Sequence, residues 1–115
     1  MTRDTIDKGA PFWAWALTLL IALGLCVTTL SPAVPSVGPP GSDKLQHFIG
    51  FALLALPLAY ARPQWGLRIV VCVFAFGALI EVIQPSVGRS AEWADLAADM
   101  AGATTAVLAM RLWRR

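Results

Sequence analysis

The chain has 115 residues, of which 57% are hydrophobic and only 14% are charged, and its formal net charge is +2. A soluble domain is typically about 25% charged. Because the apolar residues are also gathered into long blocks, the sequence predicts an integral membrane protein with no separate soluble domain. The small net charge does not favour nucleic-acid binding, and we expect no nucleic-acid partner.

The first apolar block, residues 12–30, is free of charged residues. At about 1.5 Å per residue, a helix of this length spans the roughly 30 Å hydrocarbon core of a bilayer. A signal peptide has a shorter apolar region of about 7–15 residues behind a basic leading segment. Here Asp4 and Asp7 offset Arg3 and Lys8. We therefore predict a retained transmembrane helix.

Three further helices are expected after a spacer. The spacer, residues 31–42, is rich in proline and glycine and should be extended. Ser42 and Asp43 are suitable capping residues for a helix over 44–61. A turn at 62–66 precedes a helix over 67–84, and the last helix is expected over 92–113, with Ser90 or Ala91 as its cap.

The last predicted helix combines small and acidic residues. Asp95 and Asp99 lie one turn apart near its start. Beside them runs a ridge of small residues at every fourth position, formed by Ala94, Ala98, Gly102 and Ala106. Such ridges allow membrane helices to pack closely. Packing this ridge would turn both acids toward a partner helix.

The fold class that follows is an all-α, integral membrane four-helix bundle that occupies residues 1–115 as one domain. An even number of helices places both termini on one side of the membrane. Two basic residues, Lys44 and Arg89, fall on the opposite side. Seven fall on the terminal side: Arg3, Lys8, Arg62, Arg68, Arg111, Arg114 and Arg115. The positive-inside rule therefore predicts cytoplasmic termini in a bacterial cytoplasmic (inner) membrane.

The two cysteines should remain unpaired. Cys26 lies near the outer end of the first helix, and Cys72 lies near the inner end of the third. Their depths differ by roughly 12–15 Å at about 1.5 Å per residue. A disulfide requires Cα atoms within about 7 Å of each other.

The predicted topology gathers polar residues at the outer face. The acids there are Asp43, Glu81, Glu92, Asp95 and Asp99, against Lys44, Arg89 and His47. In a structural interpretation, Arg89 pairs with Glu81 or Asp95, and His47 pairs with Asp43 or Glu81. The acids still outnumber the bases. The remaining carboxylates must be protonated, hydrated or bound to a cation.

Depth in the membrane gives two geometric expectations. Glu81, Arg89 and Asp95 share a depth and should meet, with His47 within reach. Asp99 lies roughly 13 Å along its helix from the cap, near the bilayer middle. We expect it to be neutral or to be held by a hydrogen bond from Gln84, His47 or a hydroxyl group.

In a functional interpretation, the same residues form a site. His47, Glu81 and Asp95 are candidate catalytic residues, because a histidine beside carboxylates can act in general acid–base catalysis. Candidate binding residues are Asp43, Lys44, Gln84, Arg89, Ser90 and Asp99. One histidine and several carboxylates suit Mg²⁺, Ca²⁺ or Mn²⁺ better than Zn²⁺. No metal-binding motif is present, so the sequence assigns no metal ligand and no cofactor.

Three stretches together resemble the VanZ-like membrane proteins: DKLQHFIGFALLAL, GALIEVIQ and GRSAEWADLAADMAGA. The family pattern has Asp and His opening one helix, Glu and Gln closing the next, and then Arg and Asp ahead of Gly. The matching positions here are Asp43, His47, Glu81, Gln84, Arg89, Asp95 and Gly102. The resemblance covers about residues 43–106. One departure is Asp99, where the family often has Asn, which puts a purely neutral hydrogen-bonding role in doubt.

The resemblance implies a link to resistance against the lipoglycopeptide teicoplanin and, more loosely, to envelope and surface-polymer systems. The first hypothesis is that the outer polar residues bind or modify a membrane lipid, a lipid-linked glycan precursor or a lipoglycopeptide antibiotic. The second is a non-enzymatic scaffold or assembly factor for an envelope-polymer system. The third is a small carrier or proton-coupled transporter that forms only as an oligomer. Enzymatic activity is left open, and a homo-oligomer or a membrane-protein partner is compatible with all three hypotheses.

Overall fold

The computed structural model describes residues 9–31, 42–88 and 92–113. Within them the chain forms four α-helices and two 3-10 helices, and no strand. The α-helices are α2 (Phe12–Leu30), α3 (Ser42–Ala61), α4 (Gly66–Ile83) and α5 (Trp93–Trp113). The 3-10 helices are η1 (Pro63–Trp65) and η2 (Gln84–Val87). The all-α fold is confirmed, and every α-helix begins and ends within two residues of its predicted bounds.

Three predicted features lie outside the described residues. They are the spacer at 32–41, the cap at Ser90 or Ala91, and the placement of Arg89. At the other turns, proline marks the end of a regular helix. Pro63 begins η1, and Pro85 lies within η2, which is followed by Gly88 with a positive φ of 79°. Glycine adopts this left-handed conformation at little cost.

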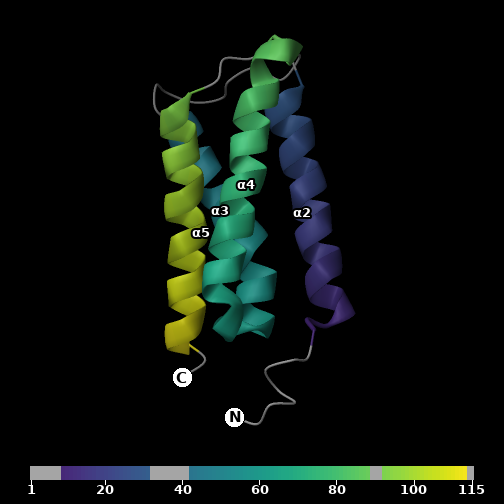
Figure 1. The fold of residues 1–115 in the computed structure, drawn as a ribbon, viewed down its shortest axis with the longest axis vertical. Coiled ribbons are helices and arrows are strands. Elements are labelled where there is room, and N and C mark those ends of the chain that lie inside the picture. The colour runs from purple at the N-terminus through teal and green to yellow at the C-terminus, as the bar shows by residue number, and fades with distance from the viewer. Residues whose placement is uncertain (1–8, 32–41, 89–91, 114–115) are drawn as a thin grey trace.

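The helices form an antiparallel bundle with α3 at its centre. Helix α3 packs against α2, α4 and α5, and its most extensive contact is with α5. The start of α2 and the end of α5 lie at the same end of the bundle (Figure 1). The opposite end holds η2 and the start of α5 (Figure 1). The polar residues of the predicted site that the structure describes lie toward this second end.

The outer surface of the bundle is suited to lipid. Large apolar side chains that point outward include Leu20, Leu23, Val71, Val82 and Leu108. Three segments of the described chain are long and apolar enough to cross a membrane: Phe12–Leu30, Ser42–Ala61 and Pro63–Val87. Helix α5 has 21 residues but is not among them. Because α5 lies side by side with α3 (Figure 1), we still predict a fourth span.

At Gly102, α5 comes so close to α3 that their backbones meet. A Cβ atom added to Gly102 would lie 2.1 Å from the carbonyl oxygen of Phe48. Gly102 and Ala106 are buried, whereas Ala94 is exposed. The predicted small-residue ridge therefore packs only in its second half. In the first half of α5, Asp95 and Asp99 occupy the buried face instead.

The orientation in the membrane stays a prediction, and two exposed positions at opposite ends of α4 test it. Cys26 and Cys72 are free, as predicted. For this experiment, both are first replaced by alanine. We expect Ser86→Cys to react with a membrane-impermeant thiol reagent in intact cells. Gln64→Cys should react only after the cells are permeabilised. The reverse labelling pattern would place the termini outside.

Candidate functional site

Lys44 is the centre of an ion-pair group at the end of the bundle where α5 begins. Its Nζ lies 2.6 Å from Asp43 Oδ2 and 2.7 Å from Asp95 Oδ1, and it also pairs with the Glu92 carboxylate. These contacts tie the start of α3 to the start of α5. The carboxylates of Asp43, Glu92 and Asp95 are close enough together to hold a metal ion. The ammonium group of Lys44 already pairs with all three carboxylates and balances part of their negative charge.

His47 links α3 to both buried acids of α5. Its Nδ1 lies 2.7 Å from Asp99 Oδ1, and its Nε2 lies 3.5 Å from Asp95 Oδ2. The imidazole is also stacked on Phe51, with ring centroids 6.3 Å apart. Of the partners expected for Asp99, the structure places His47 beside it.

The structural interpretation of the sequence paired His47 with Asp43 or Glu81, and the structure shows different partners. Asp43 shares a face of α3 with His47, but its carboxylate binds the ammonium group of Lys44. The close approach of α3 and α5 at Gly102 brings the acids of α5 to the imidazole instead.

Glu81 connects α4 to the beginning of α5. Its Oε2 accepts a hydrogen bond from the backbone N–H of Glu92, at 2.8 Å. Glu92 immediately precedes α5, so the carboxylate lies at the positive end of the helix dipole, where an anion is stabilised. The other oxygen, Oε1, is buried and has no hydrogen-bond partner among the described residues.

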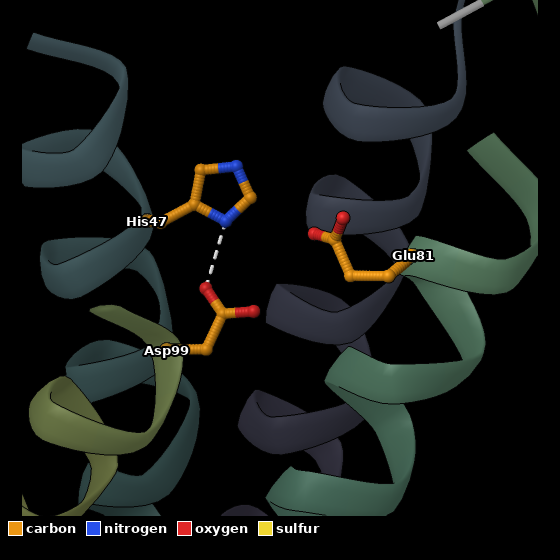
Figure 2. A group of neighbouring side chains, drawn as sticks. All are labelled: His47, Glu81 and Asp99. Atoms are coloured by element: carbon orange, nitrogen blue, oxygen red, sulfur yellow. Dashed lines mark hydrogen bonds and ion pairs between the residues drawn. The ribbon is translucent and has the colours of Figure 1, made fainter. Parts of the chain in front are cut away.

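His47, Glu81 and Asp99 converge from three helices on one point inside the bundle. One possible ligand atom from each lies within 4.8 Å of the other two. Figure 2 shows the three side chains pointing into the same space, from α3, α4 and α5. Glu81 is 3% exposed and Asp99 is fully buried. Asp99 Oδ2, like Glu81 Oε1, has no hydrogen-bond partner in the described part of the chain.

This arrangement lies inside a recognised sequence family. The family model described as VanZ/LLP1 matches residues 39–114, which include α3, α4 and α5. The chain belongs to the VanZ/LLP1 family. The resemblance predicted from the sequence is thereby confirmed. Neither a curated protein nor a solved structure matches the chain.

In this VanZ/LLP1 protein, α2 lies outside the matched region but still contacts the site. Gln84 Nε2 donates a hydrogen bond to the backbone carbonyl oxygen of Thr29, at 3.1 Å. Gln84 is buried, and its Oε1 has no partner among the described residues. The sequence placed Gln84 in the site but did not predict its contact with α2. The acceptor is a backbone carbonyl oxygen, which every residue carries, so the residue type at position 29 gave no signal for this contact.

The structure brings together most of the candidate residues predicted from the sequence. We call these residues the polar cluster: Asp43, Lys44, His47, Glu81, Asp95 and Asp99, together with Gln84, which follows Glu81 by three residues and bonds to α2. Arg89 and Ser90 lie outside the described residues of this VanZ/LLP1 protein, so the expected meeting of Arg89 with Glu81 and Asp95 stays a prediction. Glu92, which supports the cluster through Lys44 and Glu81, was not predicted as a site residue. The available signal was its position three residues before Asp95, because residues three apart on a helix are neighbours.

Proposed function

We propose that the polar cluster of this VanZ/LLP1 protein binds the head group of an amphiphile at the outer face of a bacterial cytoplasmic membrane. The candidate ligands are a membrane lipid, a lipid-linked envelope precursor and a lipoglycopeptide antibiotic. All three combine a polar group at the membrane surface with an apolar tail in the lipid phase. The outward apolar side chains of the bundle leave the tail in contact with lipid.

A set of buried acceptor atoms carries this proposal. Glu81 Oε1, Gln84 Oε1 and Asp99 Oδ2 are buried without a hydrogen-bond partner among the described residues. Buried polar groups in proteins are nearly always paired, because an unpaired group pays its full desolvation cost. The three oxygens belong to the family region and lie toward one end of the bundle. A bound polar group at this end would satisfy them.

The charge of the cluster favours a head group that offers hydrogen-bond donors. Within the described residues, Asp43, Glu81, Asp95 and Asp99 share one lysine and one histidine. A bare phosphate would be repelled by this excess of carboxylates. Hydroxyl and amino groups, as on glycans and amine-bearing head groups, would donate hydrogen bonds to the free oxygens.

The alternative is a non-enzymatic scaffold for an envelope-polymer system, and one observation favours it. Lys44 pairs with three carboxylates and so ties α3 to α5 without any ligand. In that case the polar cluster would fix the register of the helices and serve the assembly of partner proteins. The double variant His47→Leu, Asp99→Leu distinguishes the two functions, because it separates stability from binding.

Tryptophan fluorescence of the purified protein tests the proposed function. Trp93 is exposed at the start of α5, next to Glu92, and reports on this end of the bundle. The protein is titrated separately with phosphatidylethanolamine, a polyprenyl-linked glycan and teicoplanin. We expect saturable binding of at least one of them. Glu81→Gln should weaken that binding about tenfold or more, since a hydrogen bond to a charged group contributes about 1.5–3 kcal/mol.

Gln64→Ala is the matched control, because this exposed polar residue lies at the opposite end of α4. It should bind the same ligand with unchanged affinity. The proposal fails if none of the three compounds binds. It also fails if Glu81→Gln and Gln64→Ala bind as tightly as the original protein.

A further inference from the structure

We infer that His47, Glu81 and Asp99 form a binding site for one divalent metal ion. The sequence assigned no metal ligand, because these residues are far apart in the chain and form no motif. The inference uses two of the buried oxygens that also support the proposed function, Glu81 Oε1 and Asp99 Oδ2, but its test is separate, since a metal ion can be titrated without any amphiphile.

The spacing of the three side chains fits a single ion. Atoms bound to one Ca²⁺, Mg²⁺ or similar ion at about 2.0–2.6 Å lie no more than about 5 Å from each other. The ligand atoms of His47, Glu81 and Asp99 all lie within 4.8 Å of one another. Because they come from α3, α4 and α5, the helix packing sets their positions (Figure 2).

Two buried carboxylate oxygens without a hydrogen-bond partner among the described residues support a cation site. Glu81 Oε1 and Asp99 Oδ2 have no hydrogen-bond partner in the described chain, and both residues are more than nine-tenths buried. Buried charges are normally paired or coordinate a metal ion. Within the trio, His47 is the one base beside these two acids, and its Nδ1 contacts Asp99 Oδ1 and neither of the orphaned oxygens. A divalent ion would balance both carboxylates.

Gly77 keeps the space beside Asp99 open. A Cβ atom at this position would lie 3.0 Å from Asp99 Oδ2 and 3.1 Å from Leu96 Cδ1. Glycine at this position therefore leaves room for a carboxylate oxygen. Any side chain at position 77 would crowd the Asp99 carboxylate, which we assign as a metal ligand.

The neighbouring acidic group provides an internal comparison. Asp43, Glu92 and Asp95 have the same ligand-like spacing, but Lys44 pairs with all three. No lysine or arginine of the described residues pairs with Glu81 or Asp99. Among the described residues, Lys44 therefore neutralises part of the group of Asp43, Glu92 and Asp95, whereas the orphaned oxygens of Glu81 and Asp99 have no such partner.

The donor set indicates which ions to test. Two carboxylates and one imidazole suit Mn²⁺, and they leave positions on the ion for water or ligand oxygens. Neighbouring ligands on an octahedral ion at about 2.1 Å are about 3 Å apart. The contact of 2.7 Å between His47 Nδ1 and Asp99 Oδ1 is close to this spacing. On binding, the ion would replace the proton between these two atoms, and that proton would be released to water.

Electron paramagnetic resonance with Mn²⁺ tests the site directly. The untagged, chelator-washed protein is titrated with MnCl₂ in detergent, and the free Mn²⁺ signal gives the affinity. His47 is the only histidine of the chain, so bound Mn²⁺ should show coupling to a single imidazole nitrogen. We expect Glu81→Gln and Asp99→Asn to lower the affinity at least about tenfold. Competition with Mg²⁺, Ca²⁺ and Zn²⁺ then ranks the ions.

Glu92→Gln is the matched control, because it removes a carboxylate that pairs with Lys44 instead of with the proposed ion. Its affinity for Mn²⁺ should be unchanged. The inference is overturned if the original protein binds none of the four ions, or if bound Mn²⁺ shows no nitrogen coupling. Equal loss of affinity in Glu92→Gln and Glu81→Gln would also overturn it. The nitrogen coupling needs no variant, so it decides the question even if a substitution prevents folding.

Discussion

Gly102→Ala should prevent stable packing of α3 against α5. The added Cβ atom would lie 2.1 Å from the carbonyl oxygen of Phe48 and 3.1 Å from the backbone nitrogen of Ala52. Both are backbone atoms of α3, so no side-chain rotation relieves the contact and the two helices must separate. We expect a loss in free energy of unfolding of about 3 kcal/mol or more, at the upper end of the range for overpacked cores.

Gly24→Ala is the control for this substitution. Gly24 is also helical, but a Cβ atom there would meet nothing within 4 Å. Alanine is favoured over glycine in a helix by about 1 kcal/mol, so this variant should be at least as stable as the original protein. Thermal unfolding in detergent, followed by circular dichroism, compares the two. Equal melting temperatures for Gly102→Ala and the original protein would show that the helices do not approach as described.

His47→Leu should destabilise the bundle by leaving a buried acid without its partner. Asp99 is fully buried, and His47 supplies the hydrogen bond to its Oδ1. Breaking a buried charged pair by removing one partner costs about 3–5 kcal/mol. We expect a loss in free energy of unfolding at the low end of this range, about 3 kcal/mol. The second contact of His47, with Asp95, is long at 3.5 Å and should add little.

The double variant His47→Leu, Asp99→Leu should recover most of that stability. Replacing both members of a buried polar pair by apolar residues is often neutral. The same double variant should not bind the amphiphile, because the imidazole and a carboxylate of the polar cluster are gone. Thermal unfolding and the fluorescence titration are therefore measured on the same samples. If the double variant recovers stability and also binds the amphiphile as the original protein does, His47 and Asp99 are not part of a binding site. That result would favour the scaffold.

The helices were predictable from the sequence because their signals are local. Apolar blocks are long enough to cross a bilayer, and Pro63 and Pro85 mark where regular helix ends. The depth of the acids was also predictable, since each residue advances a helix by about 1.5 Å. The positions of Glu81 and Asp99 along their helices were therefore enough to place both acids toward one end of the bundle.

The pairing of side chains was not predictable in the same way. Successive residues of a helix differ by about 100° in direction, so the partner of His47 depends on how α3 and α5 are rotated against each other. That rotation is set by the backbone contact at Gly102, which is a property of two helices and not of either one. Likewise, Lys44 has three partners only because α5 begins beside it.

The burial of Asp95 and Asp99 has a consequence for how the protein is made. Helices enter a membrane in the order of synthesis, and α5, which comes last, is not among the three segments apolar enough to cross it alone. An acid facing lipid is costly, whereas an acid facing a polar partner is tolerated. Lys44 and His47 are already present on α3 when α5 emerges, and they receive both acids. We therefore expect the insertion of α5 to depend on these two side chains, so that the chain completes its own membrane topology by assembling its site.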